Sequence, residues 1–252
     1  MSTDVMAAEW LKLRTVRSTS AFLVAAAAAT LLGMTLLFLL IQAFDAATTA
    51  EQANFETADP TVVIMPFVMF FIGAIGALSI TGSPDPGLLA VPHRRLLLAS
   101  KAAVSGAIGL LAGGAFALLS FIGARLLLGD RPPPLNPWPE WTDALPTIGC
   151  TALVVAVTSV VGVGLGAVLR STAATLLTLG GLILVAPTLA HFLPTVWHLR
   201  LATVLLPNLT PQITGADHPY LLSRPGAVVV LAGYMIVALV AGALALGRRD
   251  VS

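Results

Sequence analysis

Six long apolar stretches, separated by short polar segments, fill most of the chain. Runs of about 20 apolar residues are typical of transmembrane helices, because at 1.5 Å per residue they cross a hydrocarbon core of roughly 30 Å. The stretches predict six spans, at residues 21–44, 61–80, 102–128, 147–169, 172–192 and 226–246. The first stretch is longer than the apolar core of a signal peptide, so we interpret it as a retained helix. The pattern predicts an all-α integral membrane protein with one transmembrane domain, residues 1–252.

The composition agrees with this prediction. Hydrophobic residues make up 57% of the 252 residues and charged residues only 10%, and the mean hydropathy is +0.94. A soluble domain of this size could not cover itself with so little charge. Six spans use about half of the chain, so no soluble catalytic domain fits beside them. The net charge of +1 gives no electrostatic footprint for nucleic acid.

The basic residues predict the orientation of the chain. With the N-terminus inside, the inner segments hold Lys12, Arg14, Arg17, Arg94, Arg95, Lys101, Arg170, Arg248 and Arg249. The outer segments hold Arg125, Arg131, Arg200 and Arg224. Cytoplasmic loops of membrane proteins are enriched in Lys and Arg. We therefore expect both termini in the cytoplasm, as in a multi-pass protein of a bacterial plasma membrane.

A short amphipathic helix is expected ahead of the first span, at about residues 4–18. Its predicted apolar set is Met6, Trp10, Leu13 and Val16, and its polar set is Glu9, Lys12 and Thr15. Tryptophan and cations on such a helix suit the membrane surface. The alternative is a topology signal without a structural role.

The inner segment between the second and third spans, residues 81–101, has an apolar middle at residues 87–91 framed by Pro86 and Pro92. An apolar element at the cytoplasmic surface favours burial against a partner. The segment is therefore a candidate docking element for a cytoplasmic protein, and the alternative is an interfacial turn in a basic loop.

Small residues recur at helical spacing inside the spans. They are Gly73 and Ala77 in the second span, Ser105, Gly109 and Gly113 in the third, and Gly162 and Gly166 in the fourth. Such spacing lets neighbouring helices approach closely. We expect packing within one subunit, with a subunit interface as the alternative.

Polar groups inside the spans are mostly hydroxyls, and no Asp, Glu, Lys or Arg falls near a span centre. Ion-coupled transporters usually keep ionisable residues or broken helices there. Pro66 and Pro187 are expected to kink the second and fifth spans, and a short helix over residues 196–206 is expected to turn at Pro207 and Pro211. Candidate substrate-pathway residues are Thr35, Phe67, Met69, Phe70, Thr158, Ser159 and Thr178.

Motifs of enzymes and resident cofactors are missing from the sequence. The chain has no phosphate-binding loop, no zinc-protease motif and no nucleophile elbow. Its histidines, His93, His191, His198 and His218, are scattered without metal-ligand spacing. We expect neither an enzyme nor a bound metal or cofactor.

Four segments, in order along the chain, carry a family resemblance. Residues 9–18 read Glu-Trp-Leu-Lys-Leu-Arg-Thr-Val-Arg-Ser, the first inner loop ends in Val-Pro-His-Arg-Arg and Ala-Ser-Lys, Leu-Pro-Asn stands at 206–208, and Arg-Arg-Asp at 248–250. In these segments and in its six-span layout the chain resembles permease subunits of ABC type-2 exporters, especially actinobacterial ones. It departs from many relatives at residues 81–87, a shorter stretch that lacks their Glu and Gly-Thr pair.

The resemblance implies an exporter that works with a separate ATPase chain, which would hold ATP and Mg, and with a second permease, identical or related. The candidate ATPase-docking residues are Glu9, Lys12, Arg14, Arg17, Gly87, Leu88, Leu89, Pro92, Arg94, Arg95 and Lys101. An apolar bundle dotted with hydroxyls favours a lipophilic substrate, a drug first and a lipid or glycolipid second. The alternatives are a membrane scaffold without a pathway and an ion-coupled secondary transporter.

Overall fold

The computed structural model describes residues 2–55, 59–82, 94–132, 135–136, 138, 140–215 and 222–247, and all regular structure in them is helical. The longer helices are α1 (Ser2–Thr15), α2 (Arg17–Ala46), α4 (Pro60–Thr81), α6 (Arg94–Leu128), α7 (Leu145–Leu169), α8 (Thr172–Gly180), α10 (Thr195–Val204) and α12 (Arg224–Gly247). The short elements are α3 (Thr49–Gln52), η1 (Trp141–Ala144), the π-helix η2 (Gly181–Val185), α9 (Ala186–Ala190), η3 (Leu206–Asn208) and α11 (Leu209–Thr214).

The prediction of six membrane-spanning helices is confirmed. Six segments of the described chain are long and apolar enough to cross a membrane: Arg17–Ala46, Val63–Thr81, Arg95–Leu128, Trp141–Leu169, Thr172–Ala190 and Arg224–Gly247. The third begins earlier than expected, because Arg94 to Ser100 continue the helix of α6. With 35 residues α6 is about 52 Å long, so one end extends past a hydrocarbon core of roughly 30 Å.

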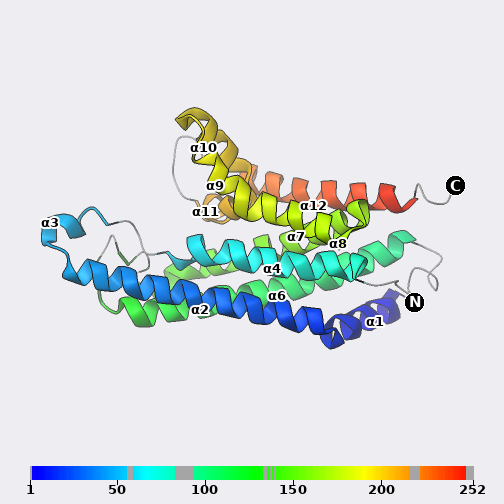
Figure 1. The fold of residues 1–252 in the computed structure, drawn as a ribbon, viewed down its shortest axis with the longest axis horizontal. Helices are drawn as coiled ribbons and strands as arrows, with labels where there is room; N and C mark the ends of the chain where they lie inside the picture. Colours follow the sequence, from blue (N-terminus) through cyan, green and yellow to red (C-terminus); the bar gives the residue numbers. More distant parts are fainter. Residues whose placement is uncertain are drawn as a thin grey trace.

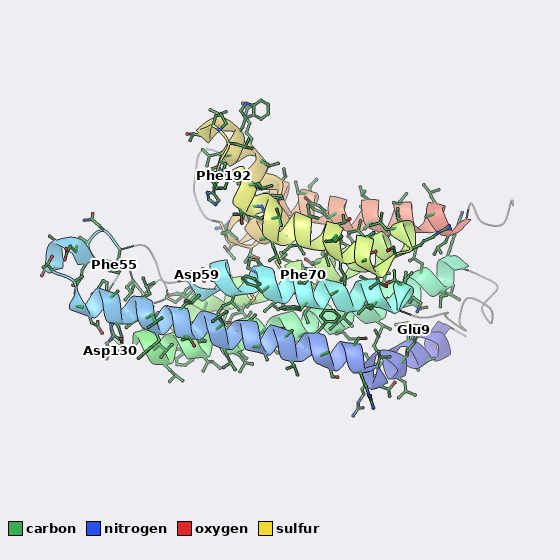
Figure 2. All side chains as sticks on the ribbon, viewed as in Figure 1. Glu9, Phe55, Asp59, Phe70, Asp130 and Phe192 are labelled. Carbon is green, nitrogen blue, oxygen red and sulfur yellow. The ribbon has the colours of Figure 1, made fainter. Side chains whose placement is uncertain are left out.

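The spans run roughly parallel, and the connecting elements gather at two ends (Figure 1). One end carries α1, the last turns of α4, α7 and α12, and the first turn of α6; we call it the α1 end. The other carries α3, α10 and α11, and we call it the α10 end. Figure 2 shows Glu9 at the α1 end and Asp59 and Asp130 towards the α10 end, with Phe70 between them.

Helix α7 is the centre of the bundle. In its most apolar stretch 72% of the residues are buried inside the molecule, against 17% for α12. It packs against α4, α6 and α12. The outer helices instead expose large apolar side chains such as Leu31, Leu126 and Val229, which is the pattern expected where a helix faces lipid.

Glycines set the close approach of α4 and α6 to α7. A Cβ added to Gly162 would meet the backbone carbonyl of Gly73, and one added to Gly109 would come within 2.9 Å of the Ala156 Cα. An added Cβ at Gly166 would lie 3.0 Å from the Ala77 carbonyl oxygen, and one at Gly113 would lie 2.6 Å from the Val155 Cβ. The five glycines singled out by their spacing, Gly73, Gly109, Gly113, Gly162 and Gly166, therefore all lie at contacts between helices within the subunit.

The short helices at both ends differ from the sequence interpretation in detail. The N-terminal helix ends at Thr15, because Val16 is extended (φ −76°, ψ 126°) and separates α1 from α2. Of the predicted apolar set, Leu13 is buried against the bundle and Met6, Trp10 and Val16 are exposed, so contact of these three with a membrane surface stays a prediction. The Glu9 side chain, one turn before Leu13, is also buried, because its carboxylate pairs with the Lys101 ammonium on α6.

At the α10 end, ion pairs and aromatic contacts hold the loops. Arg131 binds Asp45 through two hydrogen bonds of 2.9 and 2.6 Å, which joins the ends of α2 and α6. Arg125 donates to the Trp138 carbonyl at 2.6 Å and lies over the Trp141 ring. The helix expected at residues 196–206 is found as α10, followed by a turn at Pro207.

Candidate functional site

A buried ion pair lies at the α1 end of the bundle. The Lys101 Nζ lies 2.7 Å from Glu9 Oε2, and the two side chains are 2% and 8% exposed. The same ammonium donates to the Ser79 carbonyl at 2.8 Å. One cation thus joins α1, α4 and α6, three elements that are distant in the sequence.

The packing around this pair excludes water. Leu13 on α1 and Leu97 and Leu98 on α6 are buried beside it, and the Ser79 hydroxyl donates to Gly76 rather than competing for the ammonium. A buried pair gives little net stability, but loss of one partner leaves an uncompensated charge in a dry environment. The pair therefore fixes where α1 sits on the bundle.

This arrangement separates the candidate docking residues into three groups. Glu9 and Lys101 are buried against each other, and a direct part for them in docking stays a prediction. Arg14, Arg17 and Arg95 are exposed, and Lys12 is half-buried. Four candidate docking residues lie outside the described residues: Gly87, Leu88, Leu89 and Pro92. Only the backbone of Arg94 is described, at the start of α6.

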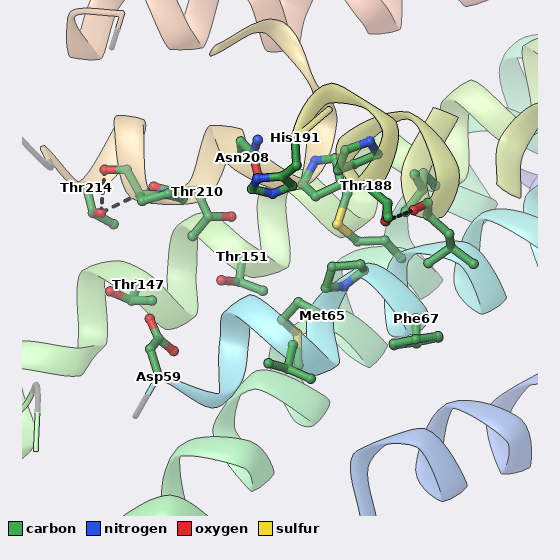
Figure 3. A pocket seen from close by; sticks show the side chains of 18 residues that line it. Asp59, Met65, Phe67, Thr147, Thr151, Thr188, His191, Asn208, Thr210 and Thr214 are labelled. Carbon is green, nitrogen blue, oxygen red and sulfur yellow. Dashed lines mark hydrogen bonds between the residues drawn. The ribbon is translucent and has the colours of Figure 1, made fainter. Parts of the chain in front are cut away.

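A cavity of about 410 Å³ lies towards the α10 end, between α4, α7, α9 and α11 (Figure 3). The π-helix η2 and the turn η3 also contribute lining residues. The lining residues are Asp59, Val63, Met65, Pro66, Phe67, Met69, Thr147, Thr151, Ile183, Leu184, Pro187, Thr188, His191, Pro207, Asn208, Thr210, Pro211 and Thr214. A volume in this range is typical of small-molecule sites.

The cavity is polar at one end and apolar at the other. Figure 3 shows Asp59, Thr147, Thr210 and Thr214 on one side, Met65 and Phe67 on the other, and Thr151 between them. From Asp59 to Met69 the lining follows α4 for ten residues, or about 15 Å. The cavity thus extends from the α10 end, where Asp59 lies, towards the middle of the span.

The predicted pathway residues are only partly found at the cavity. Phe67 and Met69 line it. The Thr35 and Thr178 hydroxyls donate to the carbonyls of Leu31 and Ala174 on their own helices, and both residues are exposed on outer faces. The other three lie inside the bundle. Thr158 and Ser159 are fully buried, and their hydroxyls donate to the Val154 and Ile72 carbonyls. Phe70 packs against Phe71. These five residues do not line this cavity, and their place on a substrate pathway stays a prediction.

Two histidines that looked scattered in the sequence meet at the α10 end. The rings of His191 and His198 lie 4.4 Å apart, centroid to centroid, and His191 lines the cavity. The Nδ1 of His198 is buried without a hydrogen-bond partner. Among the described residues no cluster of three or more His, Cys, Asp or Glu side chains could hold a metal ion.

Three residues line the cavity although the sequence did not predict them there: Asp59, Thr151 and His191. Their side chains become neighbours only through the meeting of four helices. A usable signal was present in the prolines, since Pro66, Pro187, Pro207 and Pro211 all line the cavity. Each was expected to bend or end a helix, and irregular backbone inside a membrane protein usually borders protein or a cavity.

No protein-family model matches the chain, and no curated protein sequence matches it. Function therefore has to be argued from the sites themselves.

Proposed function

We propose that the chain is the transmembrane permease subunit of an ATP-driven exporter in a bacterial plasma membrane. It would work with a separate ATPase subunit and a second permease, and would move a lipophilic substrate out of the cell. In this proposal the α1 end is cytoplasmic, because Arg14, Arg17, Arg95 and Arg170 lie there. The chain itself would not hydrolyse ATP.

The observation that carries the proposal is the buried ion pair that joins α1 to α4 and α6. It makes α1 a rigid part of the bundle at the end where exposed arginines gather. A force applied to α1 would reach α4 directly through Lys101 and the Ser79 carbonyl. Since α4 also lines the cavity, one helix takes part in both sites. This supports coupling between a cytoplasmic partner and the cavity.

The positions of the charges support an external energy source. Within the described spans the charged side chains lie near the helix ends, at Arg17, Asp45, Arg95, Lys101, Arg125, Asp143 and Arg224. A proton- or ion-coupled transporter would need ionisable groups near the middle of the membrane. ATP-driven closure of partner subunits could instead bias the bundle between two states that bind the substrate differently.

Charge reversal at Arg95 tests the docking surface. Arg95→Glu is expected to reduce ATPase co-purification with the chain by about tenfold or more, because a like charge facing an acidic partner surface costs several kcal/mol. Arg95 is exposed, so the bundle should remain folded. The measurement is the amount of ATPase, and its ATP hydrolysis, recovered with the chain from native membranes.

Arg200→Glu is the matched control, since Arg200 is exposed on α10 at the opposite end. It should leave ATPase recovery unchanged. Equal recovery with both variants would remove Arg95 from the docking surface. Absence of any ATPase with the unmodified chain would favour the scaffold or the secondary transporter.

A further inference from the structure

Helix α10 turns its apolar side away from the protein. Along this side it exposes large apolar side chains, Val196, Trp197, Leu201 and Val204. At about 100° per residue, Arg200 lies among them and is also exposed. We call these five residues the outer face of α10. His198 and Ala202 lie on the other side and are half-buried. A surface helix in water would have its apolar side inward, so the arrangement of α10 is reversed.

Hydrogen bonds on the inner side fix this orientation. The last carbonyls of a helix have no donor within it and need one from elsewhere. Gln212, itself buried on α11, donates to the Thr203 carbonyl at 2.9 Å, and the Tyr234 hydroxyl on α12 donates to the Val204 carbonyl at 3.0 Å. Rotation of the outer face towards the bundle would break both bonds. The outer face is therefore a fixed surface of the molecule.

This surface continues the lipid-facing side of the fifth span. In that span only 22% of the most apolar stretch is buried inside the molecule. Large apolar side chains are exposed along it and just after it, at Leu177, Val185, Leu189 and Phe192. Figure 1 shows α10 beyond α9 at one end of the bundle, at a steep angle to the spans, and Figure 2 shows Phe192 beside it. The outer face thus lies where a lipid-facing surface reaches the head groups.

The charge on the outer face favours lipid over a second copy of the chain. Arg200 lies within the face, and α10 contains no acidic residue. A two-fold contact would bring the same face of two copies together and bury both arginines without a counter-charge, which is costly. A membrane surface instead offers acyl chains to the apolar side chains and phosphate to a long cationic one.

We propose that α10 is an interfacial anchor, whose outer face lies in the head-group layer of the membrane at the α10 end. Trp197 and Leu201 contact the upper part of the acyl chains, and the Arg200 guanidinium binds lipid phosphate. Through Gln212 the anchor also holds α11, which lines the cavity, at a fixed depth. This inference goes beyond the proposed function, because it requires neither an ATPase nor a substrate.

Spin labels at single cysteines test the depth of the outer face. Labels are attached to Leu201→Cys or Val204→Cys in a Cys150→Ala chain in lipid bilayers, and their collisions with oxygen and with a water-soluble nickel chelate are compared. Leu31→Cys, exposed on the span α2, is the lipid control, and Ala50→Cys, exposed on the polar helix α3, is the water control. The expected depth of the outer-face labels is about 5–10 Å below the phosphates.

Arg200→Gln tests the contact with phosphate. Phosphatidylglycerol and phosphatidylcholine, each with a diazirine in one acyl chain, are compared as photolabels of α10 in nanodiscs. Loss of the cation should lower the preference of α10 for the anionic probe about fivefold. Arg14→Gln is the matched control, since Arg14 is exposed on α1 at the opposite end, and it should leave the labelling of α10 unchanged.

Three results would overturn the proposal. Collision of the outer-face labels with the nickel chelate as often as at Ala50→Cys would place the face in water. Protection from both reagents would place it against protein, as in a contact between two copies. An unchanged lipid preference of Arg200→Gln would remove Arg200 from the lipid surface. Since no ATP, ATPase or substrate is present, none of these results bears on the proposed exporter.

Discussion

Glu9→Ala is expected to lower the free energy of unfolding by about 3–5 kcal/mol, because it leaves the Lys101 ammonium buried without its carboxylate partner. Lys101 Nζ would keep the Ser79 carbonyl at 2.8 Å, and a neutral oxygen compensates the charge only in part. Lys101→Ala should have a similar effect, since it leaves Glu9 buried with an uncompensated charge. The measurement is unfolding in mixed micelles with a denaturing detergent, followed by circular dichroism.

A double-mutant cycle built from Glu9→Leu, Lys101→Met and their combination separates the ion pair from general damage to α1. The double variant Glu9→Leu, Lys101→Met removes both charges and should be within about 1–2 kcal/mol of the unmodified chain, because apolar replacements of buried pairs are often neutral. Arg14→Gln, at an exposed position of α1, should change stability by less than about 0.5 kcal/mol. Additive single effects in the cycle would contradict a direct pair.

Gly162→Ala is expected to destabilise the bundle by about 1–3 kcal/mol. The added Cβ would meet the Gly73 carbonyl and lie 3.1 Å from the Ala77 backbone nitrogen, so relief requires a backbone shift of α4 against α7. This outweighs the roughly 1 kcal/mol that alanine gains over glycine inside a helix.

Gly233→Ala is the matched control. Gly233 lies inside α12, and a Cβ there would meet nothing within 4 Å. This variant should be neutral or more stable by up to about 1 kcal/mol. Equal changes in the free energy of unfolding for Gly162→Ala and Gly233→Ala would show that the packing of α4 on α7 does not depend on close approach at Gly162.

The six spans follow from the sequence because lipid demands a long apolar run for each crossing. The close contacts of α7 are also readable, since Gly162 and Gly166 recur at helical spacing and meet Gly73 and Ala77 on α4. Helix ends are less predictable. Arg94 to Ser100 continue α6 although their charge marks them as outside the membrane, because a helix does not need lipid around it to continue.

The sites were only partly readable from the sequence. Glu9 and Lys101 were both selected, but as exposed docking groups, because their sequence separation of 92 residues hides that each is the other's partner. Thr151 looks like any hydroxyl in an apolar helix, and only the meeting of α4, α7, α9 and α11 leaves its oxygen without an acceptor or donor. Local pattern predicts which face is apolar, whereas the partners of buried polar atoms depend on tertiary packing.

The two sites give the proposed exporter a physical layout. Exposed arginines on α1 and α6 would receive a cytoplasmic partner, and the buried ion pair would carry its motion into α4. At the other end α4 forms the longest wall of the cavity. A change in the tilt of α4 would alter both ends together, which is what coupling between ATP hydrolysis and substrate release requires.

The most direct test of the central claim is uptake of fluorescent lipophilic drugs into inside-out vesicles that contain the chain with its native partners. Each vesicle preparation is measured with ATP alone and with an imposed proton gradient alone, against vesicles lacking the chain. We predict chain-dependent accumulation with ATP, sensitive to Glu9→Ala, and none with the proton gradient. Accumulation driven by the proton gradient without ATP would contradict an ATP-driven exporter.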